Sequence, residues 1–392
     1  MSNFGLNVVV AVNSTPRQFG AFAVAYLTYM GAIGITRAVA LEPLLVRAGD
    51  LSDHNRREAA CGAAGLAAAL ASGFSVLVFL AALGAGPPLQ PVLLVIAGAL
   101  PLLALQDAAR YFLFCKGEFR AAAVLDGAWT GLAFGGFALA SVLGQRDAWS
   151  FLVIWAASGA ATGIAALGIA HALPRLGPMV TWSRATTRLG RALGWDFLLF
   201  AGSSQLAIGL LGPIAGLEAL AAVRGAGTLL GPLNVILTGA RTTLLPAFGK
   251  LKSHAPGRLT PNAIRVSLGL ALLTAAAGTV LYLLPSSLGE RLIGASWDGA
   301  RKVIPPMTLM VAARAGTEGA WLGLRVIEAG RVLVTARIVA VPFTIGLTVA
   351  GAHLGSAAGG MVGLALANCV SLVMFWRGYA RSIDQPGFRG GE

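Results

Sequence analysis

Charged residues are scarce in this sequence: Asp, Glu, Lys and Arg make up 11% of its 392 residues, while 56% are hydrophobic. A soluble domain carries about a quarter of its residues as charges, so the composition excludes an ordinary globular enzyme. Cysteine and histidine are also rare, with three and four copies. The odd cysteine number without paired spacing, and the scattered histidines, predict no disulfide framework, no metal site and no cofactor.

Catalytic motifs are missing as well. Residues 294–302, GASWDGARK, echo a phosphate-binding loop but lack its Gly-Lys-Ser/Thr ending and follow no strand. The net charge is +13, but the sequence has no basic patch interleaved with aromatic residues. No nucleic-acid partner is therefore expected. A membrane glycosyltransferase or polymerase would need a large charged outer loop, which the spacing of the apolar runs does not provide. The sequence therefore predicts a protein that is not an enzyme.

Long apolar runs dominate what is present. Windows of about 20 apolar residues, long enough to cross a hydrocarbon layer of roughly 30 Å, follow one another along the chain. Because a lipid-embedded backbone must satisfy its own hydrogen bonds, these runs predict helices. The fold class is an all-α polytopic membrane protein with about twelve spans, near residues 3–13, 19–40, 60–84, 91–115, 120–143, 149–171, 196–215, 219–245, 264–285, 303–325, 331–352 and 357–378.

The first of these runs is about half the required length, and Met1 precedes it almost directly. We interpret it as a truncated first helix. Most of the 29 lysines and arginines fall in the even-numbered connections and the C-terminal tail. Because basic residues accumulate on the cytoplasmic side, this bias predicts cytoplasmic termini.

The longest polar connection divides the spans six and six. We expect an N-terminal six-helix lobe (1–172), a cytoplasmic linker (173–195), a C-terminal six-helix lobe (196–380) and a cytoplasmic tail (381–392). In the linker, Arg184, Arg188 and Arg191 recur at helical spacing. Such a helix can lie on an anionic membrane surface, although a solvated linker fits the pattern equally well.

A few charges fall within the spans. Arg314 lies near the middle of its span, where an arginine costs about 2.5–3.5 kcal/mol and normally faces a protein interior or a wet cavity. Glu318 is one helical turn away on the same face. The two residues predict either part of a substrate site or a self-neutralising pair that joins helices.

Asp107 and Arg110 also share a helix face, and Arg110 is near enough to the helix end to reach lipid phosphates. Asp107 lies deeper and requires a positive partner, as does Asp126 on the next span. Further arginines near helix ends complete a set with more positive than negative charge, which suits phosphate or pyrophosphate. The candidate cavity residues are Arg37, Arg110, Arg224, Arg241, Arg314, Asp107, Asp126 and Glu318.

Two stretches, QFGAFAVAYLTYMGAIGITRAVALEPLLVR (18–47) and LQDAARYFLFCKGEFRAAAVLDGAW (105–129), resemble actinobacterial polysaccharide-biosynthesis membrane proteins. These belong to the multidrug/oligosaccharidyl-lipid/polysaccharide (MOP) flippase superfamily. The resemblance implies two six-helix lobes that alternately open to the two sides of a bacterial plasma membrane. It also implies an anionic polyprenyl-pyrophosphate saccharide as cargo, with the pyrophosphate role falling on Arg37, Arg110, Arg224, Arg241 and Arg314.

The function expected from the sequence is therefore flipping of a lipid-linked saccharide to the outer leaflet, for cell-surface polysaccharide biosynthesis. Its partners would be that saccharide and membrane lipids, with functional coupling to a polysaccharide polymerase or to glycosyltransferases. The first alternative is a cation-coupled multidrug or metabolite exporter of the same fold, which should carry more carboxylates than arginines in its spans. The second is a membrane scaffold that transports nothing.

Overall fold

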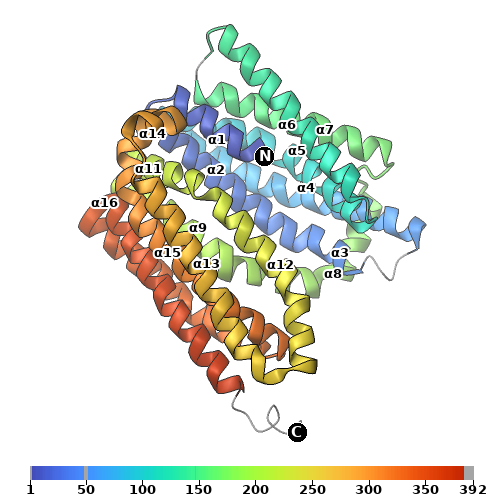
Figure 1. Cartoon of the computed structure of the whole chain (residues 1–392). Helices are drawn as coiled ribbons and strands as arrows, with labels where there is room; N and C mark the ends of the chain where they lie inside the picture. The colour runs from blue at the N-terminus through green and yellow to red at the C-terminus, as the bar shows by residue number, and fades with distance from the viewer. Residues whose placement is uncertain (1, 48–51, 146, 384–392) are drawn as a thin grey trace. The chain divides into compact units, whose positions relative to one another are not determined.

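The computed structural model describes residues 2–47, 52–145 and 147–383, and the predicted tail lies mostly outside them. Helices account for nearly all of this described part, and it contains no strand (Figure 1). The predicted all-α class is confirmed. The chain forms two compact units, Met1–Gly202 and Ser203–Glu392. The four-part division expected from the sequence stays a prediction.

The first unit contains eight α-helices and two short π-helical segments among its described residues. They are α1 (Ser2–Asn13), α2 (Pro16–Thr36), η1 (Arg37–Leu41), α3 (Glu42–Arg47), α4 (Asp53–Leu83), α5 (Leu89–Cys115), α6 (Phe119–Val142), α7 (Ala148–Ile169), α8 (Leu176–Phe197) and η3 (Leu198–Gly202).

Local sequence signals fix several of these boundaries. Thr15 caps α2: its hydroxyl accepts the amide of Gln18, whose side chain in turn accepts the amide of Thr15. This reciprocal arrangement satisfies two amides that a helix start leaves unpaired. At the end of α5, Gly117 has φ of +74°, a conformation that glycine adopts without strain. The turn at Gly117 sends the chain directly into α6.

Helix α5 is the centre of the first unit, because α4, α7 and α2 all pack against it. Close packing with α7 depends on Gly163, where a Cβ atom would lie 2.3 Å from the Cα atom of Gln106. An aromatic group completes this core: the Trp129 indole donates to the Trp155 carbonyl at 2.8 Å, and the Tyr29 ring meets Trp155 edge-on at 5.0 Å. Fully buried aromatic side chains of this size dominate the packing energy.

Helix α8 covers most of the segment predicted as a linker. Trp182 donates from its indole nitrogen to the Ala40 carbonyl at 3.1 Å, and Gly190 lets α8 approach the backbone of Val39. Helix α8 thus packs against α4 and η1 of the first unit. Its three arginines, Arg184, Arg188 and Arg191, are exposed. Their contact with a membrane surface stays a prediction.

The second unit contains eight helices and two 3₁₀ turns among its described residues. They are α9 (Ser203–Gly209), α10 (Leu211–Ala215), α11 (Leu217–Leu229), α12 (Gly231–His254), η4 (Pro256–Arg258), α13 (Leu259–Tyr282), α14 (Ser286–Ile293), η5 (Gly294–Ser296), α15 (Trp297–Val326) and α16 (Gly330–Ile383). Helix α16 is kinked at Gly355 and Ser356, whose dihedral angles are not helical, so it consists of two arms.

Helix α15 is the centre of the second unit. It packs against α13, α16, α11 and α12, and in Figure 1 α13, α15 and α16 run beside one another. Polar contacts at this centre are few but specific: the Gly319 amide donates to the Ser267 hydroxyl at 2.9 Å, and the Trp376 indole donates to the Gly316 carbonyl at 2.9 Å. Such bonds satisfy polar groups that would otherwise be costly to bury.

The protein is a multi-pass integral membrane protein. By length and composition, the described residues hold eight helices able to cross a membrane, or nine with the bent pair α11 and α12 counted as one span. The expected number of twelve is not confirmed. Helix α1, with 12 residues, is about 18 Å long and shorter than the hydrocarbon layer. Helix α15 has 30 residues but carries several charges, which lower its hydropathy.

Replacing Gly319 with alanine is expected to destabilise the second unit by about 1–3 kcal/mol, the usual cost of overpacking. A Cβ atom there would lie 1.9 Å from the Ala263 carbonyl oxygen, a backbone atom that cannot swing aside. Gly269→Ala on α13 is the control, since nothing lies within 4 Å of its Cβ position. The thermal unfolding midpoints of the two variants are compared in the same detergent. Equal midpoints for Gly319→Ala and Gly269→Ala would show that α13 and α15 are not in close contact.

Candidate functional site

A charged cluster in the first unit surrounds Asp107 on α5. Its carboxylate accepts two hydrogen bonds from Arg37, from Nε at 2.7 Å and from Nη2 at 2.9 Å. A third comes from Nη2 of Arg110 at 2.6 Å. The Asp107 side chain is only 5% exposed. A carboxylate this deeply buried is stable as an ion only when paired, and this one has a forked partner and a second arginine.

The cluster continues toward α6. Asp126 receives a weaker contact from Arg110, with Nη1 at 3.7 Å, and the Gln106 amide approaches it at 3.4 Å. The Asp126 side chain is 45% exposed, so it retains contact with solvent or lipid headgroups. Two arginines and two aspartates make this first cluster formally neutral.

Arg37 occupies a distinctive backbone position. It is the first residue of η1, a π-helical turn between α2 and α3. Such turns interrupt an α-helix locally and are frequent at functional sites. The Arg37 guanidinium also lies 5.8 Å from the ring centre of Tyr111, one turn after Asp107. The carboxylate and the ring together fix the direction of this arginine.

The second unit holds a cluster around Glu318 on α15. Arg241 of α12 donates to both oxygens of the Glu318 carboxylate, from Nε and, at 2.6 Å, from Nη2. The Glu318 side chain is 2% exposed, and the Arg241 guanidinium lies 5.1 Å from the ring centre of Trp321. The sequence spacing predicted a pair between Glu318 and Arg314 as one alternative. In the structure Glu318 accepts hydrogen bonds from Arg241, 77 positions away.

Arg314 is half-buried and lies one turn before Glu318 on α15, close enough to sense the charges of Glu318 and Arg241. With Arg314 included, the second cluster has two arginines for one carboxylate. Arg224 is half-buried on α11, which packs against α15, and its backbone carbonyl accepts the Thr228 hydroxyl at 2.9 Å. The described helices of this unit therefore place more arginine than carboxylate around α15.

The two clusters share one arrangement of side chains. In each unit, an arginine from one helix donates hydrogen bonds to a buried carboxylate on the central helix. Its guanidinium also lies over an aromatic ring that follows this carboxylate by one turn on the central helix. The first set is Arg37, Asp107 and Tyr111, and the second is Arg241, Glu318 and Trp321. In the predicted span order, the arginines belong to the second and eighth spans and the carboxylates to the fourth and tenth. The same plan thus occurs in both halves of the chain.

Of the eight predicted site residues, the structure brings four together in the first unit: Arg37, Asp107, Arg110 and Asp126. It joins Arg241 to Glu318 in the second unit, with Arg314 one turn away. Tyr111, Trp321 and Gln106 were not among the residues predicted from the sequence. The signal for the two aromatic residues was present, since each follows a carboxylate within a span by three or four positions.

Comparisons with known proteins show the fold. No protein-family model matches the chain, and neither does any curated protein sequence. Among solved structures, the lipid II flippase MurJ in an inward closed conformation gives a TM-score of 0.72 at 10% identity, over 97% of this chain and 88% of that one. A multidrug resistance MATE family transporter of the MOP superfamily, facing inward, gives 0.69 at 13% identity, over 99% and 95%. The chain has the MOP fold.

The outward-facing form of a MATE transporter also matches, with a TM-score of 0.62 at 12% identity over 97% of this chain and 92% of that one. The MOP fold predicted from residues 18–47 and 105–129 is therefore confirmed over nearly the whole chain. At these identities the comparison establishes architecture.

Proposed function

We propose that this protein is a flippase that moves a polyprenyl-pyrophosphate-linked saccharide from the cytoplasmic to the outer leaflet by alternating access. The observation that supports this best is the concentration of arginine in the second unit, where Arg241 donates to Glu318 and Arg314 lies one turn away on α15. Several guanidinium groups gathered within membrane-spanning helices favour an anionic ligand. That one protein of the same fold is a lipid II flippase agrees with this cargo class.

The proposed chemistry is binding without covalent steps. Guanidinium groups offer parallel N–H donors that match pyrophosphate oxygens, and they remain charged at every physiological pH. In our proposal Arg314 binds the pyrophosphate directly, while Arg241 exchanges between Glu318 and the phosphate. Arg224 provides a further donor in the second unit. In the first unit Arg37 and Arg110, oriented by Asp107 and Asp126, form a separate group of phosphate donors.

Reconstituted vesicles test this proposal. A fluorescent polyprenyl-pyrophosphate saccharide is inserted, and a membrane-impermeant quencher reports the fraction in the outer leaflet over time. We expect the protein to accelerate exchange between leaflets, and excess inorganic pyrophosphate to slow it by competing for the arginines. Exchange no faster than in empty vesicles would contradict the proposal.

The second candidate is a cation-coupled exporter, which Asp126 favours. Its carboxylate is 45% exposed and its contacts are long, with Arg110 at 3.7 Å and the Gln106 amide at 3.4 Å, so it is open to a cation. The MATE transporters share this fold. Uptake of a cationic dye into inverted vesicles, driven by a sodium or proton gradient and lost in Asp126→Asn, would identify this function instead.

A further inference from the structure

The π-helical turn η1 that carries Arg37 is covered by helix α8. The Ala40 carbonyl accepts a hydrogen bond from the indole nitrogen of Trp182 at 3.1 Å, and Trp182 is 6% exposed. At the neighbouring carbonyl, a Cβ atom on Gly190 would lie 2.5 Å from the Val39 oxygen, so only glycine lets the α8 backbone come this close. Two consecutive carbonyl groups of η1 are thus in contact with α8.

The sequence of this segment explains why the turn depends on a neighbouring helix. Pro43 follows Val39 by four positions and has no N–H group, so the Val39 carbonyl lacks its α-helical donor. Within η1 the hydrogen bonding is shifted by one residue, with the Glu42 amide donating to the Arg37 carbonyl. A turn with shifted and missing bonds opens more easily than a regular helix, and its position therefore depends more on the contacts around it.

Contacts on either side of η1 extend this cover. Before the turn, the Phe197 ring of α8 packs against Gly34 of α2 and leaves no room for a Cβ atom there. After the turn, Arg47 of α3 donates to the Ala185 carbonyl of α8 at 2.7 Å. Helix α8 therefore contacts the chain before, within and after η1.

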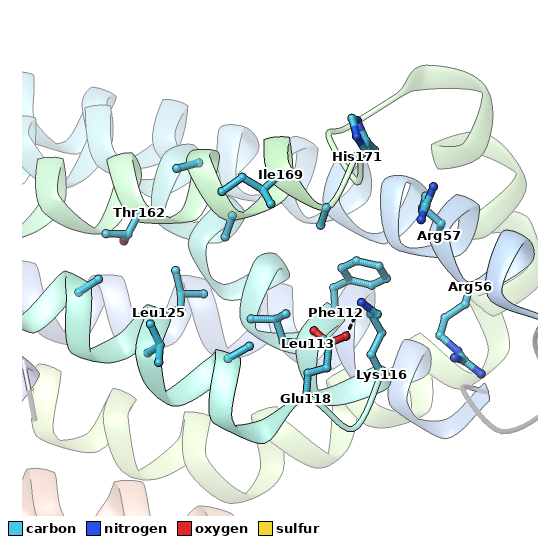
Figure 2. A pocket seen from close by; sticks show the side chains of 16 residues that line it. Arg56, Arg57, Phe112, Leu113, Lys116, Glu118, Leu125, Thr162, Ile169 and His171 are labelled. Atoms are coloured by element: carbon cyan, nitrogen blue, oxygen red, sulfur yellow. Dashed lines mark ion pairs between the residues drawn. The ribbon is translucent and has the colours of Figure 1, made fainter.

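Helix α6, by contrast, gives the first cluster little support. A groove of about 750 Å³ is lined by α4, α5, α6 and α7, and its lining along α6 and α7 consists mainly of alanine (Figure 2). Asp126 on α6 is 45% exposed and lies 3.7 Å from Arg110. A helix that leaves such a space cannot fix the arginines, whereas α8 directly contacts the turn that carries Arg37.

We propose that Trp182 and Gly190 are positioning residues of the first cluster: they hold η1 in the conformation that directs the Arg37 guanidinium at Asp107. Arg37 begins η1 and donates to the Asp107 carboxylate from Nε at 2.7 Å and from Nη2 at 2.9 Å. Because both bonds come from one planar group, a small rotation of the turn weakens both together. The consequence for transport rests on the proposed function, in which Arg37 is a phosphate donor.

The Nε–H group of Arg37 reports the position of this side chain without any cargo. In full-length protein with isotopically labelled arginine, its NMR signal is identified by its absence in Arg37→Gln. Trp182→Phe keeps an aromatic ring but removes the donor to Ala40. We expect the Arg37 Nε hydrogen to exchange with water about three- to tenfold faster in this variant, the factor that corresponds to one net hydrogen bond. The backbone amides of residues 38–47 should exchange faster by a similar factor.

The matched control is Trp129→Phe. The Trp129 indole also donates to a backbone carbonyl, that of Trp155 at 2.8 Å, and it is 5% exposed, but it lies on α6, away from η1. This variant should leave the Arg37 signal and the amides of η1 unchanged. On α8, Gly190→Ala should repeat the effect of the first variant. Gly177→Ala on the same helix should not, because nothing lies within 4 Å of its Cβ position.

Leaflet exchange in vesicles then links η1 to transport. Trp182→Phe should slow exchange about three- to tenfold, and by less than about twofold in an Arg37→Gln background, because residues that act through one another are not additive. An unchanged Arg37 signal in Trp182→Phe, or an equal change in Trp129→Phe, would overturn the proposal. So would equal slowing with and without Arg37. If the unaltered protein moved no cargo, the proposed function would fail, while the Arg37 signal would still decide whether α8 positions this arginine.

Discussion

Replacing Glu318 with glutamine is expected to destabilise the protein by about 3–5 kcal/mol, the cost of removing one partner from a buried ion pair. Glu318 is 2% exposed and holds Arg241 through both carboxylate oxygens, with Arg314 one turn away. The substitution removes the negative charge to which Arg241 donates inside the second unit. The free energy of unfolding in mixed micelles measures the effect.

Two further variants make this prediction specific. Asp126→Asn also removes one carboxylate, but from a side chain that is 45% exposed and weakly paired, so its cost should stay below about 1 kcal/mol. Combining Glu318→Gln with Arg241→Gln should recover more than half of the lost stability, because the guanidinium is then no longer uncompensated. A single Glu318 variant as mild as Asp126→Asn would show that the pair is unimportant for folding.

Replacing Arg314 with glutamine is expected to slow flipping of a pyrophosphate-linked lipid about 10- to 100-fold. A hydrogen bond to a charged group contributes about 1.5–3 kcal/mol, and glutamine keeps the polarity but loses the charge and the fork. Stability should change little, because Glu318 remains paired with Arg241. Initial rates of leaflet exchange in vesicles measure the effect.

The matched control is Arg325→Gln, at the end of the same helix, where the arginine lies 5.5 Å from the ring centre of Trp321. Its rate should stay within about twofold of the unaltered protein, and Arg314→Lys should fall between the two because it keeps the charge. If Arg314→Gln lowered the thermal midpoint as much as Glu318→Gln and left the exchange rate of the folded fraction intact, Arg314 would be structural and would not bind cargo.

The all-α class could be predicted from the sequence because the requirement is simple. A lipid-embedded segment must be apolar over about 20 residues, and that pattern can be read without any knowledge of tertiary contacts. Pro232 lies at a break between helices, since α11 ends at Leu229 and α12 begins at Gly231. Pro101, by contrast, lies within α5 without ending it, so proline alone did not locate the interruptions.

The pairing of the charges could not be predicted in the same way. Residues one turn apart, such as Arg314 and Glu318, are neighbours by helix geometry, and sequence spacing therefore favoured them. A hydrogen-bonded partner of Glu318 comes from α12, because packing on the central helix α15 brings Arg241 over Trp321. The same holds for Arg37 and Asp107, which are 70 positions apart. Contacts of this range are set by the arrangement of helices, which no local pattern contains.

The π-helical turn at Arg37 could not be predicted from the sequence either. The stretch ITRAVALEPLL has no glycine, and its one proline follows η1 rather than preceding it. The turn rotates the helix after Arg37 relative to the part before it, which changes the face that each side chain occupies. It therefore decides where the arginine points, although composition and periodicity give no sign of it.

The leaflet distribution of lipid-linked glycan in cells lacking this protein tests the central claim most directly. Cells that make the glycan and have no second flippase are complemented with the unaltered protein or with stably expressed Arg314→Gln, and the glycan in each leaflet is quantified. We expect accumulation on the cytoplasmic leaflet, relieved by the unaltered protein and not by the variant. An unchanged distribution in the cells without the protein would contradict the proposed function.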